Sequence, residues 1–362
     1  MSPRLAVLPQ YLLPKKTLTA IAGFFARQEA GALTTATIRW FIQRYGVDMS
    51  EAAFADVRDY KTFNEFFTRE LKAGSRDMAD SDFICPVDGA ISQFGAIDRD
   101  RIFQAKGHDY TIETLLGGNR ESAMRYENGW FSTIYLSPRD YHRVHMPCDG
   151  KLESMTYVPG ALFSVNPLTA RGVPGLFARN ERVICEFSTA FGPMALVLVG
   201  ATIVGSMATV WHGTVNPLRS RKIRRWTYET HGAPIVLRKG DEMGRFMLGS
   251  TVVLLMPRPD GFGMNFNPQW APEGAVRLGH PMASYQPVEK AVHKPVDKPD
   301  AADESTLADA QPATAEAAVT EDAVLPSGQD AASPADAGAP ATTEAPDLAA
   351  DPQDKPTKPH AA

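Results

Sequence analysis

The sequence predicts an α+β fold in which N-terminal amphipathic helices precede a mainly antiparallel β core and a disordered C-terminal tail. Three observations predict it. Apolar residues recur at helical spacing in residues 1–75, short β-branched runs punctuated by Gly and Pro fill residues 76–285, and residues 286–362 contain no Phe, Trp or Tyr. The strand-like runs do not alternate with helical patterns, which disfavours a parallel sheet.

The first region, residues 1–75, contains two amphipathic helices and a shorter third one in residues 61–71. Each long helix has one apolar face, made of Leu18, Ile21, Phe24 and Phe25 in the first and of Ile38, Phe41, Ile42 and Tyr45 in the second. Up to residue 46 there are six basic residues and one acidic residue. This pattern is typical of helices lying in an anionic membrane surface, and also of a helical hairpin packed on a protein core.

The β core, residues 76–285, is predicted from five apolar runs: Trp130–Leu136, Lys151–Val158, Arg182–Phe187, Met194–Val199 and Val252–Met256. The 18 residues from 194 to 211 carry no charge, which is the lower limit for a membrane-spanning helix. Their β-branched residues and Gly200 favour two buried strands with a break between them. We therefore expect no transmembrane helix.

The tail, residues 286–362, carries 15 acidic and 5 basic residues, a net charge of −10. The whole chain is −5, so residues 1–285 carry +5. A segment this polar and rich in Pro buries too little apolar surface to offset its ordering entropy, so we expect disorder.

Several classes of function lack support. The chain has three cysteines, and no two of them have CxxC spacing. This disfavours a disulfide framework or a zinc site and fits a reducing compartment. His142 and His145 lie at i and i+3 without the further ligands that a metal needs, so we expect no metal. The basic run 219–225 has no aromatic platform beside it, and we assign it to a phosphate-rich membrane surface rather than to nucleic acid.

Gly249 and Ser250, directly before the apolar run that ends at Met256, form a candidate reactive pair. Gly249 has no Cβ, so its carbonyl carbon can be approached closely. A neighbouring hydroxyl can attack that carbonyl and convert the peptide bond into an ester if a base removes its proton. An ordinary Gly-Ser turn that leads into a strand is the simpler alternative.

His142, His145 and Asp88 are candidates for acid–base chemistry. The two histidines lie in the run YHRVHMP, and an imidazole titrates near neutral pH. Asp88 lies in PVDG, where it is either a turn residue or a carboxylate that orients an imidazole and stabilises its protonated form.

These motifs together resemble the phosphatidylserine decarboxylases, which process themselves and depend on a pyruvoyl group. The resemblance runs from about residue 5 to residue 285. It rests on LGST around Ser250, PVDG around Asp88 and YHRVHMP around His145, and also on YVPG at 157–160, NERV at 180–183 and the glycine-rich segment 200–206.

The resemblance implies a zymogen that cleaves itself between Gly249 and Ser250. Asp88 and His145 activate the hydroxyl of Ser250, which attacks the Gly249 carbonyl; elimination and loss of ammonia then turn Ser250 into a pyruvoyl group. The products are a β chain, residues 1–249, and an α chain, residues 250–362, which stay associated. A homodimer is a further candidate assembly.

The implied reaction converts phosphatidylserine to phosphatidylethanolamine and carbon dioxide through a Schiff base on the pyruvoyl group, without a metal or pyridoxal phosphate. The resemblance makes His142 the decarboxylation acid. Phe163 and Val165 are candidates for contact with the acyl chains of the substrate, and packing in the protein core is the alternative use of both side chains. Where the family often has an acidic residue, this chain has Ala161, so no charged role is assigned there. The implied location is the cytoplasmic face of the inner membrane, as a peripheral protein.

Three rival interpretations remain open at this point. A hydrolase using the same Ser, His and Asp, and a non-enzymatic membrane-binding β module, both predict an intact chain. A pyruvoyl decarboxylase acting on a soluble amino acid predicts a cut chain that does not need the N-terminal helices.

Overall fold

The computed structural model describes residues 5, 7–105, 107–202, 206–215, 220–228, 233–247 and 250–288. Residues Met1–Lys294 form one compact unit. From residue 289 onward, the predicted tail lies outside the described residues. The predicted boundary at residue 75, between the helical region and the β core, stays a prediction.

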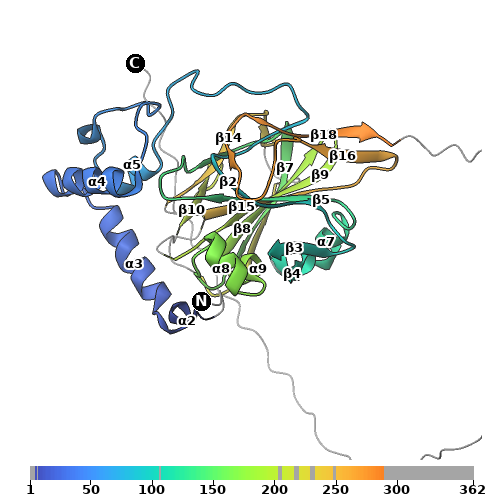
Figure 1. The fold of residues 1–362 in the computed structure, drawn as a ribbon, viewed down its shortest axis with the longest axis horizontal. Helices are drawn as coiled ribbons and strands as arrows, with labels where there is room; N and C mark the ends of the chain where they lie inside the picture. Colours follow the sequence, from blue (N-terminus) through green and yellow to red (C-terminus); the bar gives the residue numbers. More distant parts are fainter. Residues whose placement is uncertain are drawn as a thin grey trace, which may run out of the picture. The chain divides into compact units, whose positions relative to one another are not determined.

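The centre of the fold is an antiparallel sheet with nine strands among the described residues (Figure 1). Its order is β12 (Arg224–Thr227), β7 (Gly150–Val158), β8 (Arg182–Thr189), β9 (Gly192–Val199), β15 (Ser250–Met256), β5 (Trp130–Leu136), β2 (Gly89–Ala96) and β17 (Ala275–Val276), with β13 (Val236–Leu237) also paired to β7. The five apolar runs of the sequence are the five central strands of this sheet, which confirms the predicted antiparallel core.

Smaller sheets complete the β structure. One contains β11 (Gly213–Thr214), β10 (Met207–Thr209), β14 (Glu242–Phe246) and β6 (Arg143–His145); another contains β1 (Phe83–Ile84), β18 (Pro281–Pro287) and β16 (Phe262–Phe266); β3 (Arg101–Ala105) pairs with β4 (His108–Thr111). The uncharged stretch 194–211 forms β9 and β10, as predicted.

A hydrophobic core covers each face of the large sheet, so its central strands are buried on both sides. One cluster joins it to β6 and β14 through Val144, Met243 and Phe246. The other cluster lies under four short helices, α6 (Ile112–Leu115), α7 (Arg120–Met124), α8 (Pro167–Gly172) and α9 (Leu176–Arg179). Strand β15 is therefore central in both directions, between strands β9 and β5 and between two cores.

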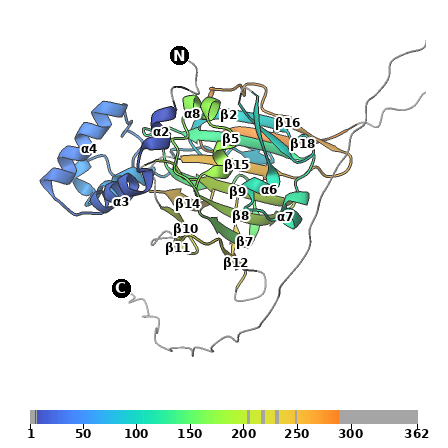
Figure 2. The same ribbon diagram turned by 90° about the horizontal axis from the view of Figure 1, so that it is seen from below.

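The N-terminal helices are α2 (Leu8–Leu12), α3 (Lys15–Ala26), α4 (Ala32–Tyr45), the 3-10 helix η1 (Val57–Asp59) and α5 (Phe63–Phe67). Figures 1 and 2 both show α3 and α4 beside the sheets rather than on a face of the large sheet. Helix α4 packs through Ile38 and Phe41 onto Phe66 and Phe67. No helix among the described residues is both long and apolar enough to cross a membrane.

Candidate active site

Ser250 is the first residue of β15 and is paired with Leu136, the last residue of β5. Alternation along the strand turns its side chain toward the same core as Val252 and Leu254, the core that includes β6 and β14. Ser250 is fully buried, and its Oγ has no hydrogen-bond partner among the described residues. An unpaired hydroxyl in a packed core is costly, which sets it apart from the Ser of an ordinary turn. Gly249 lies outside the described residues.

His142 follows the turn that begins where β5 ends. Its Nδ1 donates to the carbonyl of Asp140 at 2.7 Å, so in the neutral ring the lone pair is on Nε2. That Nε2 is buried and has no partner in the described part of the chain. The ring lies 4.0 Å, between centroids, from that of Phe67. Burial lowers the pKa of His142 to about 3, so at neutral pH it is an uncharged base.

His145, on β6, has both ring nitrogens engaged. Its Nδ1 donates to the Gly240 carbonyl at 2.7 Å, so Nε2 accepts the Tyr141 hydroxyl at 3.0 Å. Burial lowers its pKa, although the Gly240 hydrogen bond and the charge of Glu242 act in the opposite direction. Tyr141 therefore holds the lone pair with which His145 would act as a base.

The carboxylate of Asp88 accepts hydrogen bonds from groups other than an imidazole. Its Oδ2 accepts from Nη2 of Arg76 at 2.6 Å, and its Oδ1 accepts from the backbone N–H of Leu278 at 2.8 Å. Arg76 in turn binds Glu51 at 2.8 Å. No hydrogen bond between Asp88 and His145 occurs among the described residues, but the charge of Asp88 favours protonated His145.

A small polar cavity of about 260 Å³ lies beside Asp88, and its lining includes none of Ser250, His142 and His145. Asp88, Asp140 and Tyr141 line it, together with Arg69 and Arg76. The cavity thus brings the predicted carboxylate close to the tyrosine that contacts His145. The sequence motif around His145 includes Tyr141, but no separate role was predicted for it. Arg76 was not predicted at all, because its partners Glu51 and Asp88 are 25 and 12 residues away along the chain.

The two residues predicted to face the substrate, Phe163 and Val165, are 3% exposed and belong to a hydrophobic core. The Phe163 ring is contacted by the Tyr11 ring at 5.0 Å and by Lys15 Nζ at 4.2 Å. The helices α2 and α3 are therefore anchored on this segment, and contact of either residue with a substrate stays a prediction.

No cluster of three or more His, Cys, Asp or Glu side chains suited to a metal ion occurs in the described ranges. The three cysteines are free and buried. Burial raises the pKa of both Cys85 and Cys148 to about 12, which makes either thiol a poor nucleophile at neutral pH.

Comparison with known proteins identifies the class. The family model described as phosphatidylserine decarboxylase matches residues 63–284, and one described as PSD matches residues 5–46. Proteins named phosphatidylserine decarboxylase proenzyme are 65% identical over 284 residues in Dechloromonas aromatica and 62% identical over 283 residues in Herminiimonas arsenicoxydans. These alignments cover 78% of this chain and 99% and 95% of the two relatives.

The family match and the relatives define the chain as a decarboxylase of the carboxy-lyase class that is made as a proenzyme. It belongs to the phosphatidylserine decarboxylase family. The family match begins at the first residue of α5 and ends within β18, so it includes every residue predicted to take part in the chemistry.

Proposed function

We propose that this protein cuts itself between Gly249 and Ser250 and then converts phosphatidylserine to phosphatidylethanolamine and carbon dioxide. The observation that carries the proposal is the fully buried Oγ of Ser250, which has no partner among the described residues. A hydrolase that attacks an external substrate needs an accessible nucleophile, whereas attack on the adjacent peptide bond does not.

In the self-cleavage step, Oγ of Ser250 bonds to the Gly249 carbonyl carbon, and the bond from that carbon to the Ser250 nitrogen breaks. The resulting ester is then eliminated, which releases residues 1–249 with a terminal carboxylate. The new end of the smaller chain takes up water and loses ammonia. A pyruvoyl group left at Ser250 supplies an electron-withdrawing carbonyl that can condense with the amine of the substrate.

His145 is the base in this proposal, and Asp88 supports it through its charge. The support is that His145 is predominantly neutral near pH 7, because burial lowers its pKa, and that Asp88 lines the same cavity as Tyr141. Its lone pair becomes available when the Tyr141 hydroxyl turns away.

His142 has the second role, to return a proton to the carbon that loses carbon dioxide. Its unpartnered Nε2 supports this role, because nothing else among the described residues occupies that atom. The ring must first be protonated, and the carboxylate of an arriving substrate favours the charged form of a nearby imidazole. The same free lone pair makes His142 the competing candidate for the self-cleavage base.

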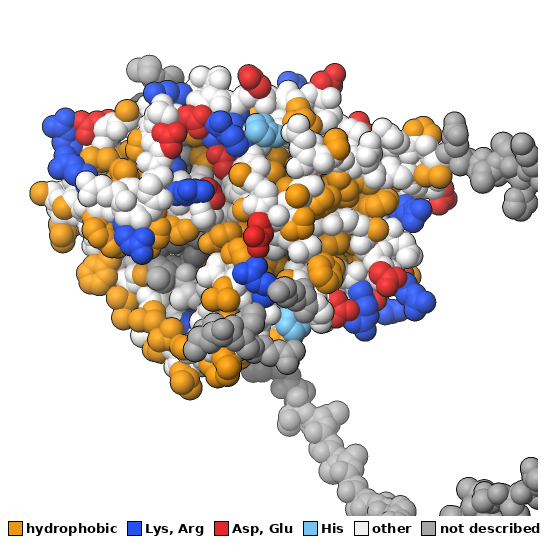
Figure 3. All heavy atoms as spheres, in the orientation of Figure 1, with side chains coloured by type: hydrophobic (Ala, Val, Ile, Leu, Met, Phe, Trp, Pro, Cys, Tyr) orange, Lys and Arg blue, Asp and Glu red, His pale blue; other side chains and the backbone are white. Residues whose placement is uncertain are grey.

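The substrate would be met at the membrane surface, on the cytoplasmic face of the inner membrane. Leu12 and Phe25 are 89% and 67% exposed, and Trp40 on α4 is 57% exposed. Figure 3 shows hydrophobic side chains gathered over α3 and α4, with cationic side chains among them. The exposed apolar residues of α2 and α3, flanked by cations, support insertion into an anionic lipid surface, whereas α4 packs on the protein through Ile38 and Phe41.

Intact mass under denaturing conditions, combined with a decarboxylation assay on phosphatidylserine, tests the proposal. The purified protein should give two chains, the smaller lighter by one ammonia than its serine-ended form. Ser250→Ala and His145→Ala should each leave one chain, whereas His142→Ala should be cut and lose most decarboxylation. Ser132→Ala removes a buried hydroxyl on β5 and serves as the matched control, which should be cut normally.

Other outcomes are equally informative. A single full-length mass in the folded unsubstituted protein contradicts self-cleavage and favours the hydrolase or the inert module. An uncut His142→Ala chain together with a cut His145→Ala chain exchanges the two histidine roles.

A further inference from the structure

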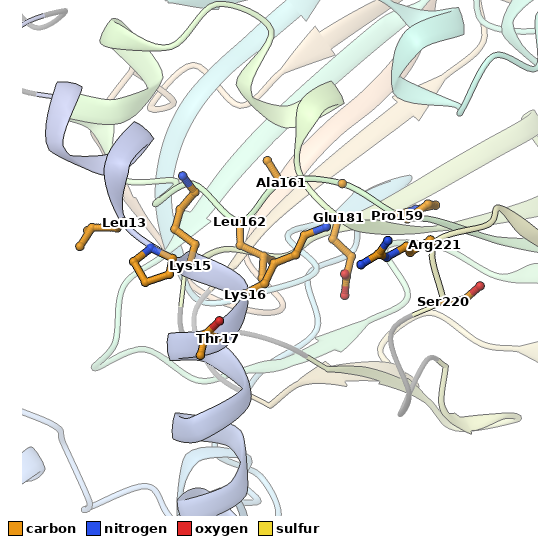
Figure 4. Close-up of a pocket in the computed structure, with 12 residues that line it drawn as sticks. Leu13, Lys15, Lys16, Thr17, Pro159, Ala161, Leu162, Glu181, Ser220 and Arg221 are labelled. Carbon is orange, nitrogen blue, oxygen red and sulfur yellow. The ribbon is translucent and has the colours of Figure 1, made fainter.

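A large cavity of about 890 Å³ opens where the N-terminal helices meet one end of the nine-stranded sheet. One wall is the first turn of α3, from Pro14 to Thr17. The other wall is the segment 159–162, which follows β7, together with Glu181, which precedes β8 (Figure 4). Ala161 on this wall contributes no charge.

Two cations point into this cavity from different elements. Figure 4 shows the side chains of Lys16 and Arg221 extending from opposite sides toward the carboxylate of Glu181. Lys15 is turned elsewhere, with Nζ bonded to the Gln10 carbonyl and lying 4.2 Å from the centroid of the Phe163 ring. Glu181 is 4% exposed, whereas Lys16 and Arg221 are exposed. The three converging groups leave a net charge of +1.

The cavity lies at the same end of the sheet as Ser250. Strand register aligns Thr251 with Val199 and Val199 with Arg182, and the backbone N–H of Gly200 donates to Glu181 at 2.8 Å. Ser250 and Glu181 are therefore aligned across the sheet, separated by two strand spacings, or about 10 Å.

We propose that this cavity binds the phosphodiester of the substrate's headgroup, with Lys16 and Arg221 as its ligands. The inference rests on the proposed function, in which the substrate amine reacts at Ser250. In phosphatidylserine a short link of two carbons and one oxygen separates that amine from the phosphorus, so the phosphate must lie close to the reacting residue. A phosphodiester carries one negative charge, which matches the net charge of the three converging groups.

The two cations suit a phosphate in complementary ways. Arg221 offers a planar fork of N–H donors, and Lys16 offers a compact point charge. Glu181 orients both cations before the substrate arrives and keeps the empty cavity from being strongly positive. Lys16 and Arg221 are thus binding residues of the decarboxylation step and have no part in self-cleavage.

The test uses Lys16→Gln, Arg221→Gln and the double variant in the full chain, with Lys222→Gln as the control. Lys222 is exposed and adjacent to Arg221 but does not line the cavity. Decarboxylation is measured on phosphatidylserine in micelles of a nonionic detergent, where the substrate carries the only phosphate. We expect kcat/KM to fall about 10-fold or more for each single variant, mainly through KM, because each variant removes a charged hydrogen-bond donor from the phosphate.

Each result decides the inference. Normal cutting of all variants shows that they fold, and unchanged KM in the double variant overturns the phosphate site. A loss that appears only after phosphatidylglycerol is added assigns the cavity to another anionic lipid and also overturns it. If the unsubstituted, fully cut protein does not decarboxylate phosphatidylserine, the proposed function fails and this inference fails with it.

Discussion

Oγ of Ser250 and Nε2 of His142 are among the buried side-chain atoms that have no hydrogen-bond partner within the described residues. Folding normally pairs such atoms, so each orphan marks a place where stability has been given up. Burial also disfavours the protonated form of His142, because it lowers the pKa of this ring to about 3, whereas in the unfolded chain the ring binds its proton near pH 6.5. The chain therefore carries a base that is kept neutral by its surroundings.

This depressed pKa predicts how stability depends on pH. The unfolded state binds more protons than the folded state below pH 6.5, so the stability associated with neutral His142 is complete above that pH and is lost as pH falls toward 3. In the Ser250→Ala background, His142→Gln should remove a slope of about 1.4 kcal/mol per pH unit between pH 6 and 4. Urea unfolding at several pH values measures it.

The control is His212→Gln, which changes an exposed histidine and should leave the slope unchanged. Equal slopes with and without His142 would mean that this ring is solvated and protonated in the folded chain.

At the scale of the element, the central strands were predictable and the surroundings of the site were not. The run Trp130–Leu136 coincides with β5 because a strand buried on both faces needs a continuous apolar sequence. Ser250 was expected just before its strand but begins it, since its backbone pairs with Leu136. The partners of Asp88 could not be predicted, because Leu278 is 190 residues away and no local pattern links the two.

Helix α3 was predicted to be amphipathic and α2 was not predicted, and periodicity does not say what an apolar face packs against. In the structure Leu12 and Phe25 are mostly exposed. Changing either to Asp should leave folding intact and weaken binding to anionic vesicles about 10-fold or more, because burying one large apolar side chain is worth roughly 1.5–3 kcal/mol. Vesicle sedimentation measures the change.

Met124→Asp is the matched control, since Met124 is 58% exposed on α7, away from these helices. An equal loss with Met124→Asp, or none with Leu12→Asp and Phe25→Asp, would contradict a membrane role for the α2 and α3 face.

At the scale of the whole molecule, the chain is longer than the relatives that it matches. Those alignments cover nearly all of each relative but about 78% of this chain, and the family match ends at residue 284. Deleting residues 289–362 should therefore leave self-cleavage and decarboxylation within about twofold of the full chain, measured by intact mass and carbon dioxide release. A loss of activity greater than 10-fold would contradict this expectation and would mean that the tail contributes to catalysis in this chain, although the aligned relatives do not have it.

The place of Ser250 in the sheet has a consequence for the reversibility of folding. The proposed cut would fall immediately before a strand that is hydrogen-bonded on both sides, to β9 and to β5. The smaller piece would then contribute the middle strand β15 and the edge strand β17 to a sheet whose other described strands come from the larger piece, and neither piece could leave without opening both cores. Refolding from the denatured state would need an encounter between two molecules and would slow on dilution. The mature protein would be assembled once, as a single chain, and would persist afterwards through the height of its unfolding barrier.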